Sequence, residues 1–318
     1  MFLFKKSYLI YISIFVVLLS LILFPKYTFE AATEGLLLWA NIIVPSLLPF
    51  IIVSNLIIHL NLVKYISFFF KPIMRVFFNL PSVAGYAWVL GMLSGYPMGA
   101  KITGDLLHQK LITPIQGQFL LTFVNNVSPM FVLGFVSTGI LDVNTQIGFL
   151  LLFILYLSSL ITGFIFRFVY GIVYSPNFEK HNYTLVQSKK SFLEIFDQCI
   201  VDAIDLIIRI GGYVIFFSII VCLAQAIPFQ SLLFKNFFLG IIEISNGISL
   251  ISNSPTALET KIVLINTIIG FGGFSVHGQT ASVLQNTNLS IPKYIFAKSI
   301  NGFITFVLTL LFFLFTAI

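Results

Sequence analysis

The chain has 318 residues, of which 58% are hydrophobic and 9% are charged. Soluble globular proteins carry about 25% charged residues, so the composition excludes a soluble domain and indicates an integral membrane protein with a single membrane domain. The net charge of +6 does not indicate nucleic-acid binding, because the lysines and arginines lie mainly between apolar runs, where they orient a membrane protein and face anionic headgroups.

The first apolar run follows Lys5 and Lys6 and has no convincing small-residue cleavage site behind it. We therefore expect residues 1–30 to hold a retained membrane span with a cytoplasmic N-terminus, rather than a removed signal peptide. A crossing takes about 20 helical residues, and the runs long enough to cross are 8–24, 36–60, 115–140, 145–169, 206–227 and 293–316.

Between these spans, residues 62–80 combine phenylalanines with Lys64, Lys71 and Arg75. Three cations at the centre of the bilayer are costly, so we expect this segment to lie in the membrane interface as a helix.

Two shorter apolar segments, 83–97 and 262–276, end in glycine-rich motifs. The motifs are Ser94-Gly-Tyr-Pro-Met-Gly-Ala-Lys101 and Gly272-Gly-Phe-Ser-Val-His-Gly-Gln279. Each is followed by a proline, Pro114 or Pro292, that opens the next apolar helix. Paired interruptions in the two halves of a membrane protein are typical of a transporter's binding site.

The positive-inside rule then gives a topology. The basic loop at 171–191 and the cluster around Arg75 are both predicted to be cytoplasmic, which makes residues 83–112 enter and leave the membrane on one side. We predict a re-entrant hairpin at 83–112, a second from the outside at 262–290, and cytoplasmic termini.

The predicted fold is an all-α polytopic membrane protein built from inverted repeats, with about six full spans and two re-entrant helical hairpins. The first repeat covers 31–170 and the second covers 192–318. The alternative is eight simple spans, with both glycine-rich segments crossing completely.

The motifs at the hairpin tips are the first candidate binding residues. Glycines let the backbone turn and leave N–H and C=O groups facing a cavity, and helix N-termini favour an anion. The alternative is that the glycines only permit close helix packing. The candidates are Ser94, Gly95, Tyr96, Gly99, Lys101, Gly273, Ser275, His277 and Gln279.

Three polar residues before Pro129, namely Asn125, Asn126 and Ser128, interrupt the middle of the span at 115–140. They predict an unwound turn that faces the same cavity, or alternatively a proline kink whose amides bond to neighbouring helices.

Three further residues are candidates for gating or support. Asp205 and Arg209 lie at i, i+4, a spacing that predicts either substrate contact or a structural ion pair. Asn301 lies in the last span at a depth comparable to that of Asn125 and Asn126. No hydrolase, metalloprotease or nucleotide-binding motif occurs, and the two cysteines have no metal-ligand spacing. We expect no enzyme activity, no metal and no cofactor.

At these motifs the chain resembles the sporulation integral membrane protein family YlbJ, also called SpoVV, within the nucleoside-recognition or Gate-domain proteins. The resemblance rests on residues 90–101, 125–129, 210–217 and 270–279. It implies a scaffold like that of concentrative nucleoside transporters and, for the nearest members, transport of dipicolinic acid across the outer forespore membrane.

The expected function is secondary transport of a small organic anion. The alternatives are a non-transporting sporulation component with the same fold, or a nucleoside transporter. The expected partners are the solute, membrane lipid and a coupling ion, with no nucleic acid; a homo-oligomer stays an open alternative.

Overall fold

The structure is a computed structural model that describes residues 2–60, 62–171 and 191–316. Every regular element in these ranges is a helix. Four are long and apolar enough to cross a membrane: α8 (Thr145–Val169), α9 (Phe192–Ala224), α12 continued by α13 (Leu258–Val283), and α14 (Ile291–Thr316). Shorter apolar helices accompany them. The predicted all-α polytopic membrane fold is confirmed.

The N-terminal helices form one side of the molecule. α1 (Phe2–Leu23) is bent by 107° from α2 (Pro25–Leu38). A proline begins α2, since its missing N–H costs nothing in the first turn. α2 continues through the π-helical turn η1 (Trp39–Ile43) into α3 (Val44–His59).

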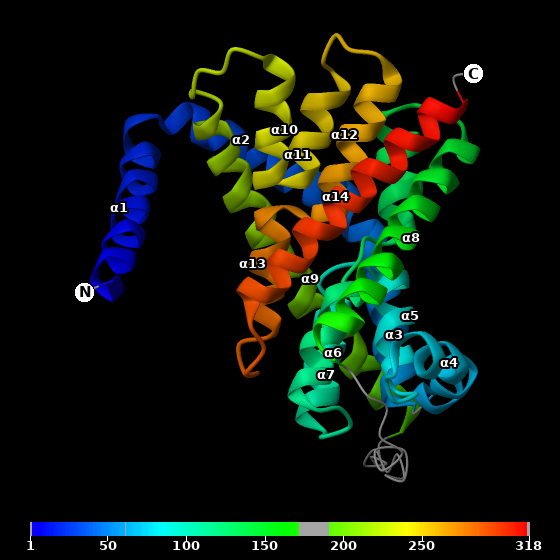
Figure 1. The fold of residues 1–318 in the computed structure, drawn as a ribbon. Helices are drawn as coiled ribbons and strands as arrows, with labels where there is room; N and C mark the ends of the chain where they lie inside the picture. Colours follow the sequence, from blue (N-terminus) through cyan, green and yellow to red (C-terminus); the bar gives the residue numbers. More distant parts are fainter. Residues whose placement is uncertain (1, 61, 172–190, 317–318) are drawn as a thin grey trace.

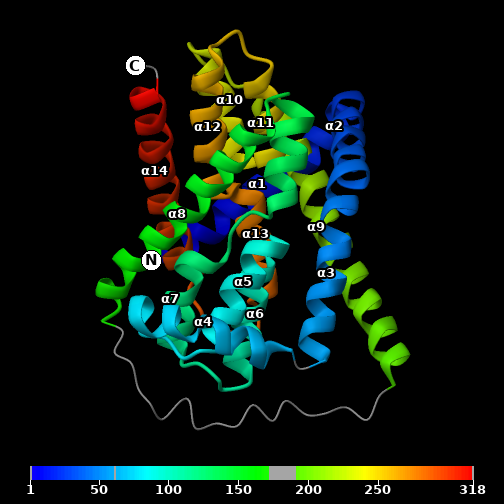
Figure 2. The ribbon, with the colours of Figure 1, turned by 90° about the vertical axis from the view of Figure 1, so that its right-hand side faces the viewer.

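α2 and α3 pack along α9, and Figure 2 shows the three helices on one side of the molecule. The indole N–H of Trp39 donates to the Ile207 carbonyl oxygen at 2.9 Å, and Gly211 leaves room for the Trp39 ring. A capping box of Ser191 and Glu194 starts α9. We call α2, η1, α3 and α9 the scaffold layer.

α4 (Val63–Phe78) lies at the lower end of the molecule in Figures 1 and 2. Phe68, Phe69 and Phe77 are exposed, whereas Met74 and Phe78 are buried. A helix with one apolar face left uncovered at the end of a membrane protein has the form expected of an interfacial helix.

The first hairpin consists of α5 (Ala84–Ser94) and α6 (Met98–His108), which pack side by side. It is followed by α7 (Pro114–Val124), the unwound residues 125–128, η2 (Phe131–Ile140) and then α8. Gly91 and Gly99 lie directly against the backbone of Val124, because a Cβ at either position would meet its carbonyl oxygen at 2.0 or 2.2 Å. The hairpin and α7 are therefore closely packed.

The second hairpin consists of α10 (Leu232–Ile242) and α11 (Ile244–Ser252), with Glu243 at its tip. Its arms touch at Gly240 and Gly247, since a Cβ on Gly247 would lie 2.0 Å from the Gly240 Cα. Figures 1 and 2 place this hairpin at the upper end and the α5–α6 hairpin at the lower end. The two hairpins thus lie at opposite ends of the molecule.

The structure corrects the position of the second hairpin. α12 (Leu258–Phe271) and α13 (Gly273–Val283) form a single candidate span, so the predicted hairpin at 262–290 is wrong. Gly272 and Gly273 have φ of +98° and +66°, which interrupts the helix without reversing the chain. The Gly95 tip therefore corresponds to Glu243, and the break at 125–128 corresponds to Gly272–Gly273.

This change also affects the predicted topology. Ser290, just before α14, exchanges hydrogen bonds with the Gln118 side chain near the start of α7, at 2.6 and 3.1 Å. α14 thus starts at the lower end and finishes at the upper end, opposite to the start of α9 (Figures 1 and 2). The predictions of a cytoplasmic loop at 171–191 and of a cytoplasmic C-terminus therefore exclude each other. Most of that loop lies outside the described residues.

Candidate functional site

A small cavity lies where both hairpin tips meet both broken helices. Its volume is about 40 Å³, which holds water-sized molecules and not a ring-sized solute. The scaffold layer supplies one apolar side of it. The lining residues are Ile43, Leu47, Gly95, Tyr96, Val127, Ser128, Phe131, Ile210, Val214, Glu243, Ile244, Ser245, Val276 and Gln279.

The first hairpin tip is pressed against the first break. Gly95 has φ of +80°, a conformation that favours glycine, and a Cβ there would lie 2.9 Å from the Ser128 backbone nitrogen. The neighbouring Tyr96 is buried, and its hydroxyl donates to the Ile269 carbonyl oxygen at 2.9 Å. The tip is thereby joined to α12 just before the second break.

Four of the sequence-predicted binding residues line the cavity, namely Gly95, Tyr96, Ser128 and Gln279. The Ser128 hydroxyl accepts a hydrogen bond from the Phe131 backbone N–H at 3.3 Å and so begins the helix after the break. Gln279 donates to the Ser275 hydroxyl at 3.5 Å. Ser275 therefore supports the lining without being part of it.

Three other predicted residues lie beside the cavity. The Asn125 amide donates to the Thr280 hydroxyl at 2.9 Å and to the Tyr294 hydroxyl at 2.8 Å. The buried His277 ring packs edge-on against Tyr294, with ring centroids 5.3 Å apart. Gly273 touches the second hairpin tip, because a Cβ there would lie 2.9 Å from the Ile244 side chain.

Ser94, Gly99 and Asn126 have structural surroundings instead. The Ser94 and Ser54 hydroxyls are 2.5 Å apart, which links the first hairpin to α3. Gly99 packs on α7, as described above. Asn126 donates to the Phe123 carbonyl oxygen at 2.8 Å and to Ser159 at 3.3 Å, so it closes the end of α7. The contacts of these three residues agree with the alternative in which they serve helix packing and not solute binding.

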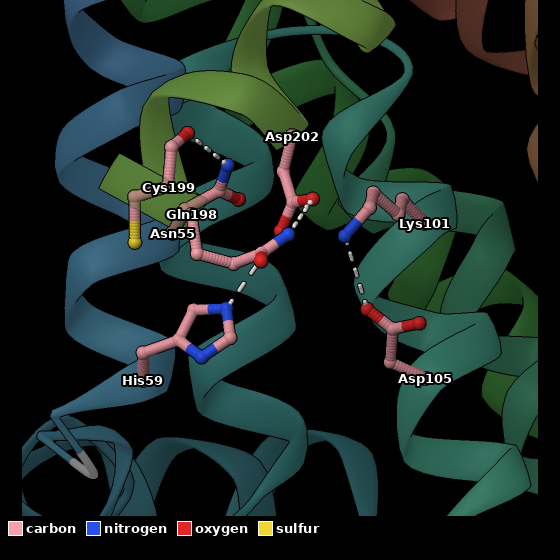
Figure 3. Close-up of polar contacts among 7 residues, drawn as sticks. All are labelled: Asn55, His59, Lys101, Asp105, Gln198, Cys199 and Asp202. Atoms are coloured by element: carbon pink, nitrogen blue, oxygen red, sulfur yellow. Dashed lines mark hydrogen bonds and ion pairs between the residues drawn. The ribbon is translucent and has the colours of Figure 1, made fainter. Parts of the chain in front are cut away.

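Lys101 is not part of the cavity lining. Its ammonium lies 3.4 Å from the Asp105 carboxylate, and both side chains are more than a third exposed. Figure 3 shows this pair beside a polar group between α3 and α9. In that group Gln198 donates to Asp202 at 2.9 Å, and His59 lies 3.8 Å from Asp202.

The candidate gating residues separate into two kinds. Asp205 and Arg209 form an ion pair at 2.8 Å with both side chains more than half exposed, and neither lines the cavity. Asn301 is buried, and its amide donates to the Gly270 carbonyl oxygen at 2.8 Å. Its own oxygen accepts from Ser158 and Thr162 at 3.2 and 3.1 Å, which joins the end of α12 to α14 and α8.

Two buried ionisable residues were not among the predicted site residues. Glu243, at the second hairpin tip, lines the cavity and accepts hydrogen bonds from the Asn246 backbone and side-chain nitrogens at 2.7 and 2.9 Å. Lys298, in α14, is 2% exposed, and its ammonium donates to the Asn125 carbonyl oxygen at 3.2 Å. An ionisable residue within an apolar run is by default a functional candidate, and that signal could have identified both.

These features define the protein as a polytopic α-helical membrane protein in which two opposed hairpins and two broken helices surround one cavity. No family model matches the chain. It is 28% identical over 310 residues to the sporulation integral membrane protein YlbJ of Bacillus subtilis (strain 168), a match that covers 87% of this chain and 76% of that protein. The chain is thus similar, over most of its length, to a sporulation integral membrane protein. No solved structure matches.

Proposed function

We propose that the protein is a secondary transporter of a small organic anion, with dipicolinic acid as the candidate solute and the outer forespore membrane as the candidate location. The observation that carries this proposal is the convergence of two hairpin tips and two broken helices on one cavity. Broken helices within a membrane are tolerated where they line a cavity, and their free backbone groups suit solute binding.

Transport requires the cavity to enlarge, because about 40 Å³ does not hold a pyridine ring with two carboxylates. The scaffold contributes Ile43, Leu47, Ile210 and Val214 to the lining, all of which are apolar. Within the described part of the chain, separation at this surface breaks the Ser54–Ser94 bond and the bond from the Asn246 amide to the Ser218 hydroxyl. Movement of the hairpins against the scaffold layer is therefore the proposed opening step.

Because Glu243 lines the cavity, binding of an anionic solute there would require a coupling cation. A carboxylate in the lining repels an anionic solute, and that repulsion is strong in a site shielded from water. A proton or metal cation bound with the solute would neutralise Glu243 and remove the repulsion. We therefore propose that the coupling cation binds at Glu243.

The distribution of cations supports a cytoplasmic lower end. Lys71, Arg75, Lys101, Lys110 and Arg167 belong to helices or loops at that end. We accordingly propose that the N-terminus is cytoplasmic and that α14 ends on the opposite side.

The test is uptake of labelled dipicolinate into proteoliposomes that contain the purified protein. We expect saturable uptake that the Gly95→Ala variant loses, because an added Cβ would clash with Ser128. The matched control is Gly134→Ala, where a Cβ meets only the end of a methionine side chain at 3.9 Å. Equal uptake into protein-free vesicles would refute transport of this solute.

The nucleoside transporter remains a second candidate because of one observation. The cavity lining holds hydrogen-bonding groups on Ser128, Ser245 and Gln279 but no cation among the described residues, which suits a neutral solute. Uptake of uridine but not dipicolinate in the same assay would favour this candidate. Absence of flux for both would favour a sporulation membrane component that transports neither solute.

A further inference from the structure

An anionic solute needs a positive group, and the cavity lining does not supply one. Glu243 is the charged residue of the lining within the described part of the chain. Lys101 lies elsewhere and pairs with Asp105. If the proposed function holds, the compensating charge must therefore come from behind the lining.

Lys298 is the buried cation that meets this requirement. Its side chain is 2% exposed, and its ammonium donates to the Asn125 carbonyl oxygen at 3.2 Å. No acidic side chain of the described residues lies within ion-pair distance of it. An ammonium has three N–H donors, so Lys298 retains capacity for a further acceptor.

The neighbours of Lys298 also have unused hydrogen-bonding atoms. Both ring nitrogens of His277 are buried without a hydrogen-bond partner in the described residues, and so is the Asn125 side-chain oxygen. A Cβ placed on Gly272 would lie 3.7 Å from the His277 ring and 3.8 Å from the Lys298 side chain, so the two residues flank the same point. A neutral imidazole has one N–H donor, and an ammonium with a nearby N–H donor is the pairing that a carboxylate accepts.

Tyr96 adjoins both this group and the cavity. Its ring lines the cavity on one side, and the Lys298 ammonium lies 5.9 Å from the ring centroid. Because Tyr96 belongs to the first hairpin tip, any movement of that tip also moves the ring. Displacement of the ring would open a path from the cavity to Lys298.

We propose, as a refinement that rests on the proposed function, that Lys298 binds a carboxylate of the transported solute, with His277 as a second donor, and that Tyr96 covers both while the hairpin is closed. The site then selects carboxylates over neutral rings of the same shape. Solute binding and displacement of the hairpin are parts of one step, since the ammonium is reached only after Tyr96 has moved.

The test compares Lys298→Met with Lys101→Met in the proteoliposome assay. We expect Lys298→Met to raise the KM for dipicolinate by about ten- to a hundredfold, because the solute loses a charge-assisted hydrogen bond. Lys101→Met should leave the KM within about twofold of the wild-type value. Competition by the neutral pyridine-2,6-dicarboxamide gives a second readout. The wild type should discriminate against this amide, and Lys298→Met should lose most of that discrimination.

Folding is monitored by thermal melting of both variants in detergent. Met fills the space of the lysine stem but leaves the Asn125 carbonyl oxygen without this donor, so the melting temperature should fall only by the amount expected for one buried hydrogen bond. His277→Phe is the second variant, since it keeps an aromatic ring and removes both nitrogens; it should also raise the KM. Absence of dipicolinate uptake by the wild type would refute the proposed function itself. Unchanged KM and selectivity in Lys298→Met and His277→Phe, with wild-type uptake intact, would refute only the role of this site.

Discussion

Substitution of Gly247 by alanine tests whether the α10–α11 hairpin is packed as described. The new Cβ would lie 2.0 Å from the Gly240 Cα, well inside van der Waals contact. The opposing atom is backbone, which cannot rotate away as a side chain can, so the two arms must move apart by more than about 1 Å. The tip at Glu243 would move with them.

The cost follows from two opposing effects. Overpacking a close contact costs about 1–3 kcal/mol, and a rigid backbone contact falls at the upper end of that range. Alanine regains about 1 kcal/mol through its higher helix propensity. The expected net destabilisation is therefore about 2 kcal/mol, measured as a lower melting temperature of the purified protein in detergent, together with loss of solute uptake.

Gly212→Ala is the matched control because nothing lies within 4 Å of a Cβ at that position in α9. This variant gains the same helix propensity without the clash, so its melting temperature should equal or exceed that of the wild type. A Gly247→Ala protein that melts at or above the wild-type temperature would refute the close contact between the hairpin arms.

Three further predictions concern topology, support and coupling. Cysteines at Lys110 and Asn288 should react with an impermeant thiol reagent from the same side of the membrane, and a cysteine at Asp142 from the other; labelling of 110 and 288 from opposite sides would restore the hairpin at 262–290. Asn301→Leu removes three buried hydrogen bonds, each worth about 0.6 kcal/mol in a membrane, so the melting curve should report a loss of about 2 kcal/mol, and an unchanged curve would contradict the bonding described. Glu243→Gln should make uptake independent of an imposed proton or sodium gradient, whereas retained gradient dependence would place the coupling cation elsewhere.

The sequence predicted the helical membrane class and the positions of several breaks because those depend on local properties. Apolar length identified α8 and α14, and Gly95 and Ser128 stood out as polar or flexible positions within apolar runs. The structure brings both to the cavity lining. These features can be recognised in the sequence because an interrupted helix needs particular residues at the interruption itself.

The second hairpin could not be recognised in the same way. Gly272 and Gly273 look like a reversal in the sequence, yet glycines with positive φ are compatible both with a turn and with two helices that continue in one direction. The actual reversal occurs at Glu243, which caps the next helix through its carboxylate and has no glycine beside it. Which event occurs depends on packing such as the Gly240–Gly247 contact, which joins residues through tertiary structure.

Lys298 was missed for a different reason. It lies near the start of a predicted span, close to Lys293, where a cation normally reaches the interface. In the structure the break at 125–128 supplies a carbonyl acceptor, and the side chain points inward to it. The inward direction of the Lys298 side chain therefore depends on Asn125, which lies 173 residues away in the sequence.

Both helix breaks depend on α14, which is translated after them. α14 supplies a side-chain donor to one carbonyl group at each break, Lys298 to Asn125 and Asn301 to Gly270. Carbonyl groups left without donors in the hydrocarbon region are costly. The nascent chain therefore keeps the Asn125 and Gly270 carbonyl groups without these donors until α14 has been translated and inserted. A ribosome that stalls before α14 would leave a product open to quality-control proteolysis, however many of its earlier helices had already entered the membrane.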